Sequence, residues 1–397
     1  MTEQWVNPAD ALTPLEVAAS VLLGPHPRVS LPVGGRTVSP REALEESLRA
    51  ALRRPPCLIA FSGGRDSSAL LALAAHVAAR EGLPEPVPIT ARYPGVAEAD
   101  EETWQEQVIQ HLGVKEWVVR SFDDEVDLVG PVARDLMLRR GLPYPYNLHL
   151  QAPLAIEAAG GSFITGLGGD EAFMPAARPI AVLAGYVRPV PRDALRVAAL
   201  VAPRSVRRRR LARSETLSFP WLRPEANRAL TSSWVETATR MPMRWDASLA
   251  DWWRSRYLQL TIATLSQLGV DLGVRVHQPF ADAGVIAALA AAGGVRGFRS
   301  RTAALEALFG ELLPAELPRR STKASFNGVL WNEHSQVFAA NLLDGSLDRA
   351  LEEADLGEVV DPDALRAHWT SATPAANSFL LLQACWVALH RQRHPEP

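Results

Sequence analysis

The chain contains 397 residues, of which 47% are hydrophobic and 21% are charged, and its formal net charge is −3. This composition is typical of a globular protein with a sizeable core, and it excludes fibrous, disordered and membrane-embedded classes. The small net charge excludes a surface built throughout for nucleic acid or anionic lipid. The N-terminal stretch lacks the pattern of a secretory signal and no run of 18 apolar residues is present, so we expect a cytoplasmic protein without a membrane partner.

The first elements are predicted from capping residues and apolar runs. Residues 1–40 are rich in Pro, Gly and Val and show no sustained period, so we expect an irregular N-terminal extension there. Ser39 and Pro40 are a good N-cap and a good first-turn residue, and they predict the start of a helix. The apolar run at 57–61 then predicts a strand that is buried on both faces, and residues 67–82 predict a helix.

Strands and helices alternate further along the chain. We predict strands at 86–93 and 116–122, helices at 99–113, within 125–140 and within 149–159, and a strand that enters a glycine turn in 161–173. This order predicts an α/β protein with a doubly wound parallel sheet in residues 41–180. From about residue 180 the strand signals stop, and residues 181–397 are expected to be mainly helical with loops. Ligands of such sheets bind beyond the carboxyl ends of the strands.

The first glycine turn, SGGRDSS at residues 62–68, lies between a predicted strand and a predicted helix. Backbone N–H groups, the helix dipole and serine hydroxyls can bind an anion there, and Gly63 and Gly64 let it approach the backbone closely. A Walker loop would place a lysine after the glycines, and this turn has none. Asp66 would repel a bare phosphate, so it predicts a divalent cation between them. The alternative is a glycine turn that only caps the helix.

A second glycine turn, TGLGGDE at residues 165–171, carries the carboxylates Asp170 and Glu171. Together the two turns resemble the N-type ATP pyrophosphatases. SGGRDSS is similar to their pyrophosphate-binding loop, and TGLGGDE is similar to its companion in the synthetase domain of asparagine synthetases. Two further segments of that domain resemble GVRVHQPFAD at 273–282 and LLPAELPRRSTKASF at 312–326.

The resemblance covers about residues 41–390. It implies an asparagine synthetase-like domain at 41–397 with the PP-loop fold, which is of the adenine-nucleotide α-hydrolase-like type. It also implies ATP and Mg²⁺ as cofactors, with Asp66 and Asp170 matching the magnesium ligands. The residues implied to bind the nucleotide are Ala60, Ser62, Gly63, Gly64, Asp66, Ser67, Ser68, Thr165 and Gly166. The residues implied to act in catalysis are Lys323, Asp170 and Glu171.

Lysine usage supports a special role for Lys323. Lys115 and Lys323 are the two lysines among 41 basic residues, so a lysine in this chain can mark a place where the planar arginine does not serve. In the family the matching lysine lies on a mobile loop beside the α-phosphate and stabilises charge as an acyl-adenylate forms and is attacked. The alternative is a surface lysine in a polar loop, which is our interpretation of Lys115. Arg320 precedes the lysine by one residue more than in the family, so the resemblance implies little about it.

Two departures from the asparagine synthetases bear on function. Those enzymes begin with a glutaminase domain whose nucleophile is an N-terminal cysteine, whereas Thr2 follows the initiator Met here and about 40 residues precede the synthetase-like part. We therefore expect that this polypeptide makes no ammonia from glutamine. After the first glycine of TGLGGDE those enzymes have Glu, and their β-lactam-forming relatives have Tyr. Leu167 stands there in this chain, and it can neither deprotonate nor orient an amine.

These features predict an ATP-dependent ligase that adenylates a small-molecule or peptide carboxylate and transfers the acyl group to an amine. We expect it to act in the biosynthesis of a natural product such as an antibiotic. The first alternative is a lasso-peptide macrolactam cyclase with a precursor or leader peptide as partner, because the C-terminal segments, among them DLGEVVDPDALRAHW at 355–369, are similar to such enzymes. Further alternatives are an ammonia-dependent asparagine synthetase, a tRNA-modifying enzyme and an inert binding partner. A nucleic-acid partner is not expected, because no basic groove is visible.

Two remaining features have structural interpretations. Cys57 and Cys385 lie in apolar surroundings without the spacing of a metal site, and they predict buried free thiols. The dense basic run at 203–215 predicts a solvated helix face or loop, and a contact for an acidic peptide or nucleic acid is the alternative.

Overall fold

The computed structural model describes residues 12–26, 29, 38–200, 202–214, 217–322, 324–371 and 374–393. The strands are β1 Cys57–Ala60, β2 Val87–Arg92, β3 Val118–Ser121, β4 Ser162–Ile164 and β5 Arg275–His277. The helices up to β4 are α2 Pro14–Ala19, α3 Pro40–Leu52, α4 Arg65–Glu81, α5 Glu102–Leu112, α6 Pro131–Arg140 and α7 Ala152–Ala155, with short 3-10 turns η2 Leu148–Gln151 and η3 Ile156–Ala158 around α7.

The later helices form most of the remaining chain. They are α8 Gly169–Ala172, α9 Arg178–Leu183, α10 Pro191–Ala198, α11 Arg204–Ser214, α12 Pro224–Arg240, α13 Trp245–Trp253, α14 Arg256–Asp271, α15 Ala283–Gly293, α16 Arg301–Phe309, α17 Asn327–Leu330, α18 Glu333–Asn341, α19 Leu347–Glu353, α20 Pro362–Trp369 and α21 Phe379–Arg393. Within the described ranges, no helix is both long enough and apolar enough to cross a bilayer.

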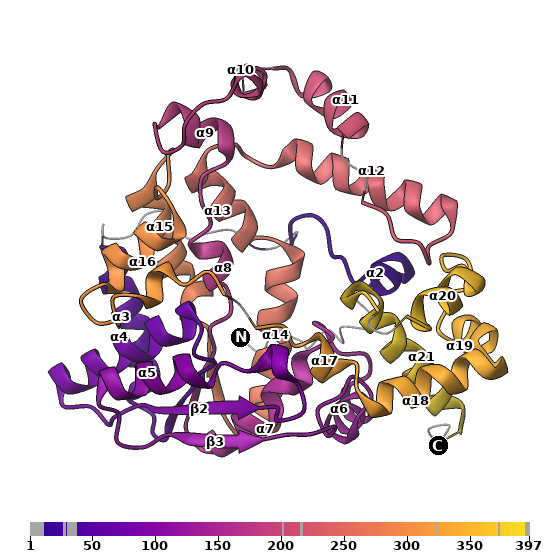
Figure 1. The fold of residues 1–397 in the computed structure, drawn as a ribbon, viewed down its shortest axis with the longest axis horizontal. Helices are drawn as coiled ribbons and strands as arrows, with labels where there is room; N and C mark the ends of the chain where they lie inside the picture. The colour runs from indigo at the N-terminus through magenta and orange to yellow at the C-terminus, as the bar shows by residue number, and fades with distance from the viewer. Residues whose placement is uncertain are drawn as a thin grey trace.

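The five strands are parallel and follow the order β3-β2-β1-β4-β5. From β1 the chain adds β2 and β3 on one side, and it then returns to add β4 and β5 on the other side. The direction of strand addition therefore reverses between β1 and β4, which is where open α/β sheets bind their ligands. Figure 1 shows β2 and β3 at the lower edge of the molecule with α4 and α5 above them. The predicted α/β class with a parallel sheet is confirmed.

Strand β1 shows how the sheet is buried on both faces. Cys57 and Ile59 belong to a core that they share with α3, α4 and α5, whereas Leu58 belongs to another core that α7 and η3 cover. Because alternate residues of a strand point to opposite faces, a strand covered on both sides needs the continuous apolar run that the sequence has. Cys57 and Cys385 are both buried free thiols, as predicted.

Strand β5 differs from the prediction, which placed no strand after about residue 180. Arg275–His277 pairs in parallel with Ser162–Ile164 at one edge of the sheet. The strand has three residues of mixed polarity, so it carries no apolar run that the sequence could reveal. Its pairing depends on β4, which is far away in the chain.

Helix α2 corrects the prediction that residues 1–40 are irregular. The Thr13 hydroxyl accepts a hydrogen bond from the N–H of Glu16, and the Glu16 carboxylate accepts one from the N–H of Thr13, so the helix begins with a capping box. The helix packs into a second large core together with α21, and Trp221 Nε1 donates to the carbonyl of Ala18 at 2.8 Å. The irregular-extension prediction is therefore wrong for Pro14–Ala19.

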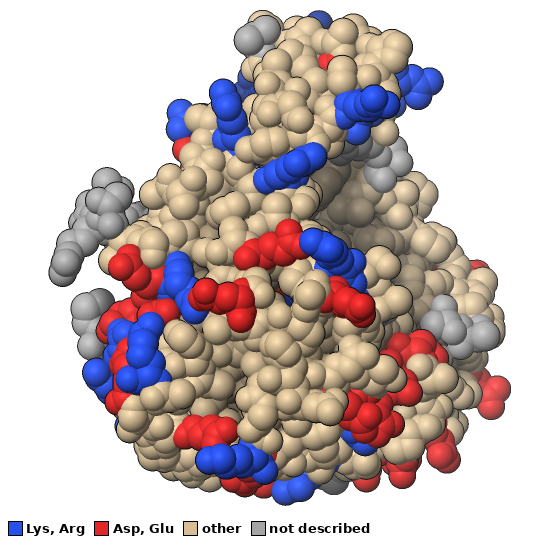
Figure 2. Space-filling model, turned by 60° about the vertical axis from the view of Figure 1, so that its left-hand side comes forward, with Lys and Arg blue, Asp and Glu red and all other residues tan. Residues whose placement is uncertain are grey.

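Helices α9–α12 lie at the top of the molecule, away from the sheet (Figure 1). Figure 2 shows mainly basic side chains on this upper part and few acidic ones. The predicted basic run forms α11, and none of its residues is buried. Arg204 and Arg208 pair with Glu236 of α12, and Arg207 donates to the carbonyl of Thr239 at 2.8 Å. The run is therefore an exposed helix that docks on α12 through part of its arginines.

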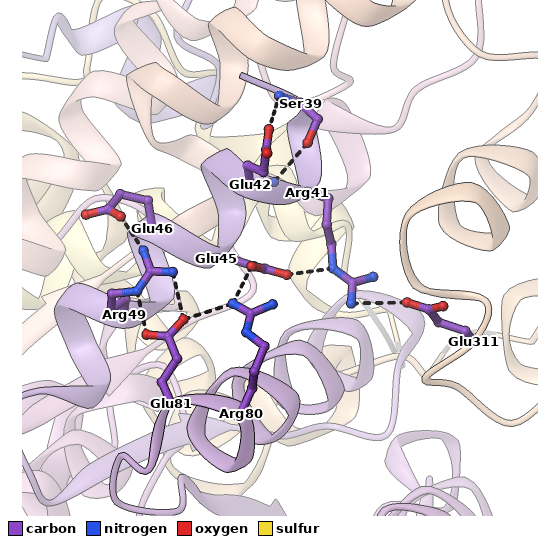
Figure 3. A network of polar contacts seen from close by, with 9 residues as sticks. All are labelled: Ser39, Arg41, Glu42, Glu45, Glu46, Arg49, Arg80, Glu81 and Glu311. Carbon is purple, nitrogen blue, oxygen red and sulfur yellow. Dashed lines mark hydrogen bonds and ion pairs between the residues drawn. The ribbon is translucent and has the colours of Figure 1, made fainter. Parts of the chain in front are cut away.

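A charged network holds α3 against the C-terminal end of α4 (Figure 3). The Glu45 carboxylate accepts hydrogen bonds from Arg41 Nε at 3.1 Å and from Arg80 Nη2 at 2.6 Å. Arg49 donates two hydrogen bonds to Glu81, at 2.7 and 2.8 Å. The Glu45 side chain is 11% exposed, so its charge depends on these partners, whereas exposed pairs at the rim contribute little.

Replacement of Glu45 by Gln should lower the free energy of unfolding by about 1–2 kcal/mol at neutral pH, because Arg41 and Arg80 each lose one charged partner, the less exposed one. Burial raises the pKa of Glu45, but the hydrogen bonds from Arg80 and Arg41 outweigh burial and hold it below its usual 4.5. A carboxyl with a lowered folded pKa stabilises the fold above its unfolded pKa, and this contribution is lost as the pH falls through the folded pKa. Urea unfolding should show the full difference near pH 7 and a smaller one below pH 4.5.

Glu46→Gln is the matched control, because the Glu46 side chain is 75% exposed and pairs with Arg49 at the surface. It should change the free energy of unfolding by less than about 0.5 kcal/mol. Equal effects of the two substitutions, or a Glu45→Gln effect that is the same at all pH values, would contradict the assignment.

Candidate active site

A cavity of about 470 Å³ opens at the carboxyl ends of β1, β2 and β4. The predicted site residues that line it are Ala60, Ser62, Gly64, Asp66, Ser67, Thr165, Gly166 and Asp170. The sheet explains why they meet: β1 and β4 are neighbours with Ile59 opposite Ile164, so the turns that follow them lie side by side. The structure thus brings two glycine turns that are far apart in the sequence into one cavity.

The first glycine turn leads from β1 directly into α4. Its shape is held by serine hydroxyls, since Ser67 Oγ donates to the carbonyl of Gly64 at 3.2 Å and lies 3.1 Å from Ser62 Oγ. Gly64 is the N-cap of α4, and no side chain in the described part of the chain caps this helix. The first N–H groups of α4 and the positive end of its dipole therefore lie at the cavity wall, ready to bind an anion.

Two glycines let the turns approach their neighbours. Gly63 has a φ of +77°, and a Cβ at this position would lie 2.8 Å from Cγ of Gln105. Gly169 allows a still closer approach, because a Cβ there would lie 2.4 Å from Cγ of Asp66. A larger residue at position 169 would push the Asp66 carboxylate away, so this glycine sets how closely the second turn approaches the first.

An arginine that the sequence analysis missed binds both aspartates. Arg301, the first residue of α16, forms ion pairs with Asp66 and Asp170 through its two terminal nitrogens. The side chains of Arg301 and Asp66 are 17% and 18% exposed, so the first pair is largely removed from water. Burial raises the pKa of Asp66, although the charge of Arg301 opposes this effect. Two close carboxylates repel each other, and the positive charge of Arg301 offsets part of this repulsion. Arg301 lies in no recognisable motif, so no signal in the single sequence marks it.

The same two carboxylates fit a divalent cation. Asp66 Oδ1 is buried and has no hydrogen-bond partner among the described residues. In those residues no group of three or more Asp, Glu, His or Cys side chains could hold a metal. Mg²⁺ is usually bound by one or two protein carboxylates and completes its shell with phosphate oxygens and water. Asp66 and Asp170 therefore suit a Mg²⁺ ion that binds together with a phosphate ligand.

Arg320 ties the segment before Lys323 to the first glycine turn. Its Nη1 donates to the carbonyl of Gly63 at 3.0 Å, and its guanidinium pairs with Glu101 and lies 5.0 Å from the ring centre of Trp104. The side chains of Arg320 and Glu101 are 4% and 7% exposed, so this buried pair fixes the position of the segment. Lys323 itself lies outside the described residues, and its role stays a prediction.

Three of the predicted site residues are not part of the cavity lining. Gly63 contributes its carbonyl to Arg320, and Ser68 is fully buried in α4. Glu171 follows Asp170 in α8, and burial raises its pKa with a further contribution from the charge of Asp170. Leu167 does line the cavity, and it packs against an apolar cluster that contains Leu148 and Leu265.

The comparisons with known proteins agree with this geometry. The model of the asparagine synthase family matches residues 40–389, a range that contains both glycine turns, Arg301 and the segment around Lys323. A search of curated proteins finds no match. The match covers most of the chain, and members of the family are ATP-dependent carbon–nitrogen ligases. The chain therefore belongs to the asparagine synthase family and is an ATP-dependent, amide-forming synthetase in general terms.

Proposed function

We propose that the protein forms an amide by way of an acyl-adenylate, with AMP and pyrophosphate as products, in the biosynthesis of a specialised peptide or small molecule. A substrate carboxylate oxygen attacks the α-phosphorus of ATP, and the bond to the pyrophosphate breaks. An amine nitrogen then attacks the acyl carbon, AMP leaves, and the amine loses a proton. The observation that carries this proposal is the meeting of the uncapped α4 N-terminus with Asp66 and Asp170 in one cavity.

The groups at the two glycine turns and near Lys323 each have a proposed part in this reaction. The leaving pyrophosphate is assigned to the first N–H groups of α4 and to the hydroxyl of Ser62, whereas the Ser67 hydroxyl holds the turn in shape. Mg²⁺ held by Asp66 and Asp170 would neutralise phosphate charge. Charge stabilisation at the α-phosphate is assigned to Lys323 by the family resemblance, and Arg320 is a positioning residue because it acts by holding the neighbouring segment.

A lasso-peptide macrolactam cyclase is the special case in which one peptide supplies both the carboxylate and the amine. Three segments favour it, at 276–282, 319–326 and 355–369. The first two also resemble the asparagine synthetase domain, so they do not distinguish a cyclase from other ligases of the family. The third contributes Leu356, Val360, Leu365 and Trp369 to the second core, and none of its described residues lines the cavity. The general amide synthetase is therefore preferred to the cyclase.

The purified protein should catalyse an exchange of labelled pyrophosphate into ATP that depends on a carboxylic acid. Asp66→Asn, Asp170→Asn and Lys323→Ala should each lower the exchange rate by at least about 100-fold, because they remove metal ligands or charge stabilisation at the α-phosphate. The measurement is ATP–pyrophosphate exchange with a panel of acids.

Lys115→Ala is the matched control, because it removes the other, exposed lysine of the chain and should keep full exchange. An inert binding partner would show no exchange in any form of the protein, and an asparagine synthetase would show it with aspartate and form asparagine from ammonia. The proposal fails if the wild type neither binds nor exchanges ATP with any acid of the panel.

Arg301→Ala should lower the melting temperature of the nucleotide-free protein in EDTA by about 2–5 °C, because Asp66 and Asp170 lose the cation between them. Added Mg²⁺ or Mn²⁺ should raise the melting temperature of this variant more than that of the wild type, because no arginine competes for the carboxylates. Thermal unfolding over a series of metal concentrations measures both effects. Arg301→Lys keeps the charge but has one nitrogen in place of two, so its metal response should lie between those of Arg301→Ala and the wild type. A metal response of Arg301→Ala no larger than that of the wild type would contradict the assignment.

A further inference from the structure

The charged groups of the cavity are concentrated around the first glycine turn. The six charged residues among the described lining are Arg65, Asp66, Glu101, Asp170, Arg301 and Arg320. Arg65 and Asp66 begin α4, and Asp66 shares Arg301 with Asp170. Glu101 pairs with Arg320, which in turn donates to the carbonyl of Gly63 in the same turn. The side of the cavity that handles phosphate is therefore densely charged.

The side of the cavity toward α14 is lined by uncharged side chains. We use the name α14 wall for Pro145, Leu148, Leu167, Tyr257, Thr261 and Leu265, all of which line the cavity. Leu148 and Leu265 are each 5% exposed and belong to one apolar cluster, with Leu167 packed against it. Thr261 Oγ1 donates to the carbonyl of Tyr257 at 2.8 Å, so its hydrogen is used within the helix. Burial raises the pKa of Tyr257 to about 12, with further contributions from the charges of Glu171 and Asp170, so the phenol is uncharged at neutral pH and the nearby charges are negative.

The strand order separates the place of the nucleoside from that of the acyl group. Lining residues of β2 and its end, among them Ile89 and Tyr93, lie on one side of β1, whereas α14 packs beside β5 on the other side. The rings of Tyr93 and Phe326 meet edge to face at 5.9 Å, and this apolar, aromatic side suits a planar base. If the pyrophosphate binds at the first glycine turn and the base lies near β2, the acyl group would lie against the α14 wall.

We propose that the α14 wall selects a carboxylic acid whose neighbouring groups are uncharged, as in a peptide or an N-acyl amino acid, and that it rejects a free amino acid. This inference rests on the proposed function, which places the reacting carboxylate in this cavity. Free aspartate would bring a second carboxylate close to Asp170 and Glu171, and none of the described wall residues carries a cation that could pair with it. Burial of an unpaired charge against apolar side chains is strongly unfavourable.

A neutral amide next to the carboxylate has a partner in the same cavity. Gln151 lines the cavity, and its Oε1 is buried without a hydrogen-bond partner in the described ranges. This oxygen can accept a hydrogen bond from an amide N–H, which removes the cost of leaving the oxygen unpaired. The cavity therefore offers an acceptor to a peptide-like substrate, whereas the described residues of the α14 wall offer no cation to a free α-carboxylate.

Two matched probes test this substrate class with the full chain. Free L-aspartate and N-acetyl-L-aspartate α-methylamide share the side-chain carboxylate and differ in whether the two α-groups are charged. Isothermal titration in the presence of Mg²⁺ and α,β-methylene-ATP, which cannot release pyrophosphate, should show at least about tenfold tighter binding of the blocked probe. Equal or tighter binding of free aspartate, or no binding of the blocked probe and its glutamate homologue, overturns the proposal.

Substitution at Leu167 gives a second test in the same assay. Leu167→Glu places a negative charge at the wall, and it should strengthen binding of L-aspartate α-methylamide, which has a free ammonium, by about tenfold relative to wild type. Leu167→Gln has nearly the same size without the charge and should give no such gain. The melting temperatures of both variants report whether they fold, and an equal gain from Glu and Gln would refute the charge argument.

Pyrophosphate exchange separates this inference from the proposed function. Exchange that is supported by free aspartate and not by the blocked acids would refute the substrate class and leave the amide synthetase intact. Tighter binding of the blocked probe without exchange for any acid would refute the synthetase and leave the neutral subsite intact.

Discussion

Two carboxylates of like charge, Asp66 and Asp170, must lie close together at the ends of adjacent strands, and the cavity is organised around this requirement. Parallel pairing of β1 with β4 brings the two turns to the same edge of the sheet. Gly169 removes the side chain that would keep the second turn away from Asp66. Arg301 then supplies a positive charge to both carboxylates from a helix that begins more than a hundred residues later. The arrangement meets the need of two neighbouring acids, one of them largely buried, for a cation, and Mg²⁺ bound with a nucleotide would meet the same need more fully.

Charged and uncharged side chains line different sides of the cavity, so phosphate binding and acyl-group binding are assigned to different sides. On the phosphate side, Arg301 and Arg320 form ion pairs with Asp66 and Glu101 that are largely buried, so these side chains are fixed before a ligand arrives. A preorganised polar environment stabilises developing charge without the cost of reorienting dipoles during the reaction. The α14 wall has apolar packing in place of this network. Leu167 belongs to the second glycine turn, and its apolar side chain extends the α14 wall to this turn.

Local patterns in the sequence were sufficient to predict the core of the sheet and the two glycine turns. The turn around Asp66 could be predicted because its glycines, serines and carboxylate are neighbours in the sequence and need no distant partner to form the turn. Arg301 and Arg320 could not be assigned, because their partners are far away in the chain and an arginine alone carries no pattern. Strand Arg275–His277 was missed because its pairing partner, and not its own composition, makes it a strand. The helix Pro14–Ala19 was missed although its capping box was readable, since proline and glycine nearby favoured an irregular segment.

The ion pairs of the cavity also determine how a nucleotide reaches it. The charged residues of the described lining are three arginines and three acids, so their formal charges cancel. A lining with no excess positive charge among its described residues attracts a polyanion only weakly over distances beyond a Debye length, which is about 8 Å at physiological ionic strength. With these described residues alone, ATP would enter at an ordinary diffusive rate that depends little on salt. Selection of ATP over other ligands would begin at contact, where the N–H groups and the cations at the first glycine turn can bind its phosphates.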